Sequence, residues 1–188
     1  MKRFLCLSFV LLSLSLFSQS RQSLLSAALK NSSPGDSSFL LRDSVLAHIY
    51  YDAESDSILL SGLKDVPGLT QADADYMRMQ LQHYRAHCWT ADSIPNTVIV
   101  PSSAVPAAAL SAKKSAKAWT KYYATYHYQY FEMSEPVFSK DGMYAIVYTA
   151  QQCGSNCGNG GATLFHFEKG QWRPVKNLFS FSKQGAKN

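Results

Sequence analysis

Two cysteines separated by three small residues, Cys153 and Cys157, form the most specific local feature of the sequence. In an oxidising compartment such a close pair forms a disulfide, which closes a short loop and holds that connection in one shape. A redox-active dithiol is an alternative, although such motifs usually space their cysteines by two residues. A metal site is a second alternative, but zinc would need two further ligands. We therefore predict a structural disulfide, and Cys88 keeps no assigned partner.

Two histidines four residues apart, His83 and His87, could reach one metal ion from the same face of a predicted helix. The residue after His83 is Tyr84 where the zinc-protease motif has Glu, so that pattern is missing. The alternative is a half-exposed helix face without metal. We favour this alternative and expect neither a metal nor a cofactor.

Two glutamates, Glu132 and Glu135, are the acid–base candidates, but they stand beside a proline and nothing in the sequence places them across a substrate. The serines form no Gly-x-Ser-x-Gly elbow. An enzyme would gather these carboxylates with His127 or His166 in one cleft. The sequence therefore predicts no catalytic residues.

The segment 122–131 contains five tyrosines, and exposed tyrosines make good platforms for sugars or peptides. The candidate binding residues are Tyr126, Tyr128 and Tyr130. The alternative, which we favour, is a corner between a helix and a strand that needs half-buried aromatic residues.

The elements that must position these residues follow from hydrophobic periodicity. Helices are expected over 21–30, 40–51, 70–88 and 108–126, with Thr70 as a cap and Asp73 at the third helical position. Strands are expected over 57–61, 97–100, 137–138, 144–149, 163–168 and 171–176, and 154–161 reads as a glycine-rich connection. In the strand at 163–168, Phe165 and Phe167 are expected to face the core.

This order predicts an α+β fold, with N-terminal helices packed on a C-terminal antiparallel β-meander. A single domain is expected over 39–179, after a flexible N-terminal segment at 21–38 and before a polar tail at 180–188. The chain has 188 residues, of which 46% are hydrophobic and 16% charged, which is typical of one domain and excludes a disordered chain.

Residues 1–20 have the pattern of a secretory signal peptide: Lys2 and Arg3, an apolar stretch, and small residues at the expected cleavage site. Its removal would leave 16 basic and 13 acidic residues, a net charge of +3. That charge is weak evidence for nucleic-acid binding. We therefore expect an exported protein with no integral membrane segment after cleavage.

Several motifs occur in a fixed order between Leu69 and Val175. They include Trp119-Thr-Lys-Tyr-Tyr, Asp141-Gly, Cys153-x3-Cys-Gly-x-Gly and Gly170-Gln-Trp. This order resembles an uncharacterised family of exported bacterial proteins of the Bacteroidetes type. The resemblance implies an exported location and no established activity, and Cys88 departs from the pattern.

Taken together, the sequence predicts an exported protein with a non-enzymatic binding or interaction domain of the cell envelope. The expected partner is an envelope protein or a peptide or glycan ligand, and not nucleic acid. The alternative is a small extracytoplasmic hydrolase or thiol-redox enzyme.

Overall fold

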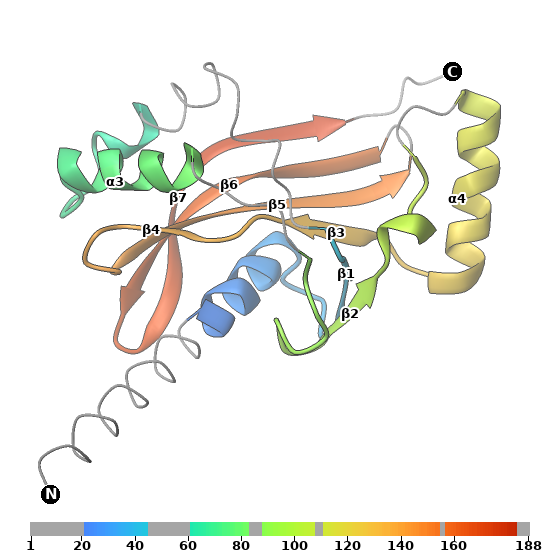
Figure 1. Cartoon of the computed structure of the whole chain (residues 1–188), viewed down its shortest axis with the longest axis horizontal. Coiled ribbons are helices and arrows are strands. Elements are labelled where there is room, and N and C mark those ends of the chain that lie inside the picture. Colours follow the sequence, from blue (N-terminus) through green and yellow to red (C-terminus); the bar gives the residue numbers. More distant parts are fainter. Residues whose placement is uncertain (1–20, 45–60, 83–87, 108–110, 155–156, 184–188) are drawn as a thin grey trace, which may run out of the picture.

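A seven-stranded sheet forms the centre of the molecule (Figure 1). The structure is a computed structural model that describes residues 21–44, 61–82, 88–107, 111–154 and 157–183. The strand order is β2-β1-β3-β5-β6-β7, and β4 pairs with β5 outside this path. The strands are β1 (Phe39–Arg42), β2 (Thr97–Val100), β3 (Tyr130–Met133), β4 (Val137–Phe138), β5 (Tyr144–Gly154), β6 (Cys157–Glu168) and β7 (Gln171–Lys183).

The sheet is mixed, so the expected layout of N-terminal helices on an antiparallel meander is wrong. Strand β1 runs parallel to both β2 and β3, whereas β3, β5, β6 and β7 pair antiparallel. The error arises at β1, where a helix was expected from Leu40. Burial alternates along β1, with Phe39 and Leu41 in the core. A short apolar run fits both periods, and here the strand is formed.

The helices cover both faces of the sheet and are distributed along the chain. Residues 21–32 are helical and bury four residues in the cluster that contains Phe131, Val147 and Phe165. The opposite face packs against α3 (Gln71–Gln82) and α4 (Ala112–Tyr126), and a short 3-10 helix, η2 (Ser102–Ala104), precedes α4. Segment 21–32, which was expected to be flexible, is therefore part of the packed structure. Its core residues are Leu24, Leu25, Ala28 and Leu29.

Helix α3 begins with the predicted capping box. The Asp73 backbone N–H donates to Thr70 Oγ1 at 3.2 Å, and the Thr70 backbone N–H donates to Asp73 Oδ2 at 3.0 Å. Ala74, Met77 and Leu81 form the buried face of this helix. Cys88, the last residue of the helix expected over 70–88, is exposed.

Strand β6 begins at Cys157, so the expected glycine-rich connection at 154–161 is wrong for most of its length. The glycines let neighbouring backbones approach closely: a Cβ at Gly161 would overlap the carbonyl oxygen of Phe179. Both Leu164 and Phe165 are buried, because both faces of this strand are covered. The C-terminal stretch also differs from the expected tail, since β7 continues to Lys183.

Within the part of the chain that the structure describes, none of the helices combines the length and hydrophobicity needed to cross a bilayer.

Candidate functional site

Helix α4 stands beyond the ends of β3 and β5 and carries an aromatic cluster (Figure 1). Trp119 and Tyr122 are buried against Tyr130 of β3 and Val100 of β2. Ser115 on the same helix is also buried, whereas the neighbouring Ala116 is exposed. His127 ends the helix in the left-handed conformation, with φ 64°, and so turns the chain towards β3.

The three candidate binding tyrosines differ in exposure. Tyr130 is only 5% exposed and stacks on Trp119, with ring centroids 5.9 Å apart. Tyr126 is half-buried and stacks on Tyr122 at 4.9 Å. Tyr128 is 70% exposed. Tyr126 and Tyr128 line one cavity of about 400 Å³, whereas the buried Tyr130 fills the contact between α4 and the sheet.

A buried carboxylate, Glu132, lies beside this cluster and is 7% exposed. Its Oε1 accepts a hydrogen bond from the Arg42 guanidinium at 2.6 Å, and its Oε2 accepts one from the Gln152 amide at 3.1 Å. Arg42, Glu132 and Gln152 come from the neighbouring strands β1, β3 and β5. The sheet register therefore assembles a polar group from residues far apart in sequence.

The Arg42 side chain is held in place from the loop that precedes α4. Its Nε donates to Ser102 Oγ at 3.2 Å. Ser102 is fixed in turn by Asp43, whose carboxylate accepts from both the Ser102 hydroxyl and its backbone N–H. This chain of contacts orients Arg42 towards Glu132. A preorganised guanidinium is suited to hold a polar ligand as well as its own partner.

These residues line a cavity of about 540 Å³, which we name the Glu132 cavity. Trp119 and Tyr130 provide aromatic surface in its wall, and Lys183 adds a second positive charge. Ligand pockets usually combine aromatic surface with convergent polar groups, and both are present in this wall. The full lining is Arg42, Ser102, Val105, Pro106, Ala107, Ser115, Trp119, Tyr130, Glu132, Gln152, Gly154 and Lys183.

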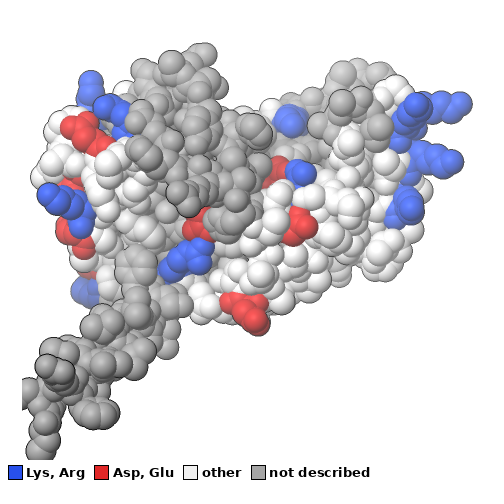
Figure 2. Space-filling model, viewed as in Figure 1, with Lys and Arg blue, Asp and Glu red and all other residues white. Residues whose placement is uncertain are grey.

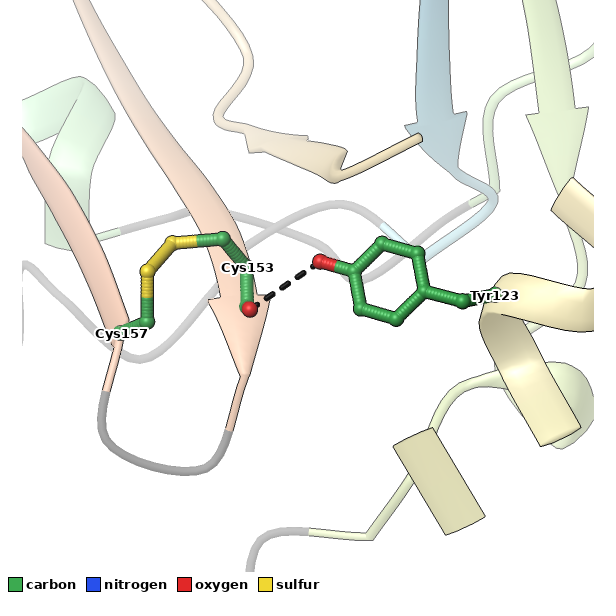
Figure 3. Close-up of a disulfide and its surroundings, with 3 residues drawn as sticks. All are labelled: Tyr123, Cys153 and Cys157. Carbon is green, nitrogen blue, oxygen red and sulfur yellow. Dashed lines mark hydrogen bonds between the residues drawn. A yellow bond between two sulfur atoms is a disulfide. The ribbon is translucent and has the colours of Figure 1, made fainter. Parts of the chain in front are cut away.

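The predicted disulfide is present between Cys153 and Cys157, whose Cα atoms are 5.0 Å apart. It joins the end of β5 to the start of β6, next to Gln152 and Gly154 in the cavity wall. The Tyr123 hydroxyl on α4 donates to the Cys153 carbonyl at 3.0 Å (Figure 3). The disulfide and this tyrosine together fix the wall of the cavity relative to α4.

The surrounding phenols remain neutral. Burial raises the pKa of Tyr130, and the nearby Glu132 carboxylate raises it further. The pKa of Tyr148 is raised by the same two causes. Both phenols are therefore hydrogen-bond donors at any physiological pH, and neither is an anionic nucleophile.

The acid–base candidates do not meet. Glu135 pairs with Arg21, which belongs to the helix on the opposite face of the sheet. His166 stacks on Tyr144, with centroids 4.5 Å apart, and His127 is an exposed helix cap.

His83 and His87 lie outside the residues that the structure describes. Among the residues it does describe, no three His, Cys, Asp or Glu side chains are grouped to hold a metal ion.

Sequence reasoning missed Arg42, Gln152 and Ser102. No short motif links them, because strand pairing and the loop that contains η2 bring them together. The one available signal was that Glu132 sits in an otherwise apolar strand, where a buried carboxylate needs a partner.

No family model, no curated protein and no solved structure matches the chain.

Proposed function

We propose that this chain is an exported binding domain of the cell envelope that holds a peptide or glycan segment in the Glu132 cavity. The observation that carries the proposal is the buried Glu132, held by Arg42 and Gln152 in the wall of a cavity lined by Trp119 and Tyr130. A fold gains little from burying such a pair, since an apolar replacement is often as stable. Ligand recognition supplies a reason to keep it.

The chemistry of the wall favours a ligand rich in hydrogen-bonding groups. Arg42 and Lys183 donate hydrogen bonds, Glu132 accepts them, and Gln152 does both. Peptide backbones and sugar hydroxyls match such a mixed set, and the rings of Trp119 and Tyr130 provide apolar contact. The lining carries two positive charges and one negative charge, so it does not favour a polyanion.

Binding is favoured over catalysis because the other acid–base candidates do not lie beside Glu132. Each Glu132 oxygen accepts one hydrogen bond, from Arg42 or Gln152, and keeps a second lone pair for a ligand. Glu135, His127 and His166 lie elsewhere in the fold. The geometry therefore supports recognition of a ligand without its conversion.

Export is supported by the pattern of residues 1–20 and by the disulfide, since disulfides persist in oxidising compartments. The resemblance to exported bacterial proteins points the same way. Fractionation of cells that express the full chain tests this part. A processed protein outside the cytoplasm is expected, and an uncleaved cytoplasmic protein would contradict it.

Titration with peptide and oligosaccharide libraries tests the binding site, with tryptophan fluorescence as the readout. Trp119 lines the cavity, while Trp89 and Trp172 are buried on the opposite face of the sheet. A bound probe should change the fluorescence of the natural chain, and the change should disappear in Trp119→Phe. Glu132→Gln should weaken binding about tenfold or more, because hydrogen bonds to a charged group are lost.

Glu135→Gln is the matched control, because Glu135 is also paired with an arginine but lies away from the cavity. It should leave affinity unchanged. Equal affinity in the Glu132 and Glu135 variants would contradict the proposed site. Cleavage of a bound peptide or glycan would instead identify a hydrolase.

A further inference from the structure

A second cavity lies on α4, separated from the Glu132 cavity by the loop 105–107, whose residues line both. We name it the Tyr122 cavity, and its volume is about 350 Å³. The Glu132 network plays no part in its wall. The lining is Ser103, Ala104, Val105, Pro106, Ala107, Ala118, Lys121, Tyr122, Thr125 and Tyr126.

One residue of this wall carries a polar atom that lacks a partner. Tyr122 is 2% exposed, and its hydroxyl is buried without a hydrogen bond in the described structure. The other tyrosines of α4 differ: Tyr123 donates to Cys153, and Tyr126 is only half-buried. A buried hydroxyl without a hydrogen bond lowers the stability of the fold. We therefore expect such a group where a bound ligand supplies the missing partner. Phenylalanine would serve packing alone equally well.

The charge and the apolar surface of the cavity indicate which kind of ligand would accept a hydrogen bond from the Tyr122 hydroxyl. Lys121 is the only charged side chain in its lining as described, and the remaining wall is mostly apolar. Figure 2 shows the lysines of α4 projecting into solvent at one end of the molecule, with no acidic side chain beside them on this face. A ligand that fits would carry a negative charge and an apolar body.

We propose that the Tyr122 cavity binds a small monocarboxylate with an apolar chain, whose oxygen accepts a hydrogen bond from Tyr122 and whose charge is balanced by Lys121. Burial, with the neighbouring Tyr123 and Tyr126, raises the pKa of Tyr122, so its hydroxyl keeps the proton that it donates. The apolar chain would lie against Val105, Pro106 and the ring of Tyr126. This site goes beyond the proposed function, since it uses a different cavity and a different ligand.

Isothermal titration calorimetry with sodium octanoate tests the site on the purified chain. The natural protein should bind octanoate, and 1-octanol, which has the same chain without the charge, should bind more weakly. Tyr122→Phe should weaken octanoate binding about tenfold, because a hydrogen bond to a charged oxygen is lost. Lys121→Gln should weaken it several-fold, as expected for an exposed charge.

Lys117→Gln is the matched control, because Lys117 is exposed one turn earlier on α4 and does not line the cavity. It should leave octanoate affinity unchanged, as should Glu132→Gln, which separates this site from the proposed function.

A stability measurement excludes a merely structural role for Tyr122. Without ligand, Tyr122→Phe should unfold at an equal or higher urea concentration than the natural chain, because it removes an unpaired buried hydroxyl. We expect Tyr122→Phe to bind octanoate more weakly and to be at least as stable towards urea as the natural chain. Absence of octanoate binding by the natural chain, or full affinity in Tyr122→Phe, would overturn the proposal.

Discussion

The Tyr123 hydroxyl on α4 donates a 3.0 Å hydrogen bond to the carbonyl oxygen of Cys153, the first half of the disulfide. This contact connects α4, which carries the aromatic cluster, to the connection between β5 and β6. Gln152 and Gly154 flank Cys153 and line the Glu132 cavity. The shape of the cavity therefore depends on both the hydrogen bond and the disulfide.

Tyr123→Phe should lower the free energy of unfolding by about 1 kcal/mol, the usual contribution of one hydrogen bond. The loss should be smaller in the Cys153→Ala, Cys157→Ala background, where the acceptor is held less firmly. Urea unfolding of the four proteins measures this coupling. Tyr128→Phe is the control, because Tyr128 is exposed. An equal loss in both backgrounds would mean that the two features are independent.

Removing the disulfide with Cys153→Ala and Cys157→Ala should cost about 2 kcal/mol, because the bridge closes only a short loop in the unfolded chain. The four-residue separation keeps this entropic gain small. Unfolding of the variant against the natural chain gives the value, after mass spectrometry of unreduced peptides has verified the bridge. Free thiols at both positions in exported protein would refute the structural role.

Arg42→Met should destabilise the chain by about 2 to 4 kcal/mol, because it leaves the buried Glu132 carboxylate without its cation. Adding Glu132→Gln should recover much of the loss, because the unpaired charge is then gone. Thermal or urea unfolding of the natural chain, both single variants and the double variant forms a double-mutant cycle, which gives the coupling energy between the two residues. If the two losses simply add, the pair is not coupled as the structure implies.

Thr70→Ala should cost about 1 kcal/mol at neutral pH through loss of the cap of α3. The hydrogen bonds from the Thr70 hydroxyl and backbone lower the pKa of Asp73 below its ordinary 3.8. A lowered folded-state pKa contributes stability that is present above pH 3.8 and is lost as pH falls through the folded value. The difference in free energy of unfolding between the natural chain and the variant should therefore become smaller below pH 3.8. Urea unfolding at several pH values measures it. A difference that grows in acid would contradict this sign.

Gly161→Ala should destabilise the β6–β7 pairing by more than about 2 kcal/mol, because a Cβ has no room beside the Phe179 carbonyl. Gly35→Ala is the matched control, since nothing lies within 4 Å of a Cβ at that position. Urea unfolding should show a large loss for the first variant and little change for the second. Equal behaviour would mean that the glycine run is not required for close pairing.

Local patterns predicted several elements correctly, because their signals are contained in a few neighbouring residues. The capping residues Thr70 and Asp73 marked the start of α3, and the strand expected over 144–149 is present within β5. The disulfide was also predicted from the spacing of its cysteines. Each of these features depends on chemistry within a short segment.

Long-range features could not be predicted in the same way. Strand β1 pairs in parallel with β2 and β3, which are far from it in sequence. No local sequence pattern encodes this pairing. The glycines at 158–161 suggested a loop, although their lack of side chains serves close strand packing. For the same reason, Arg42 and Gln152 could not be assigned to Glu132 before the sheet register was known.

The most direct test of the central claim is nuclear magnetic resonance of the labelled chain with the tightest probe from the peptide and oligosaccharide titrations. The account predicts that shifts concentrate on the Trp119 indole N–H and the backbone amides of Arg42, Glu132 and Gln152, while the indoles of Trp89 and Trp172 stay unchanged. Shifts confined to the opposite face of the sheet, or no binding by any probe, would contradict the proposal that the Glu132 cavity is the binding site.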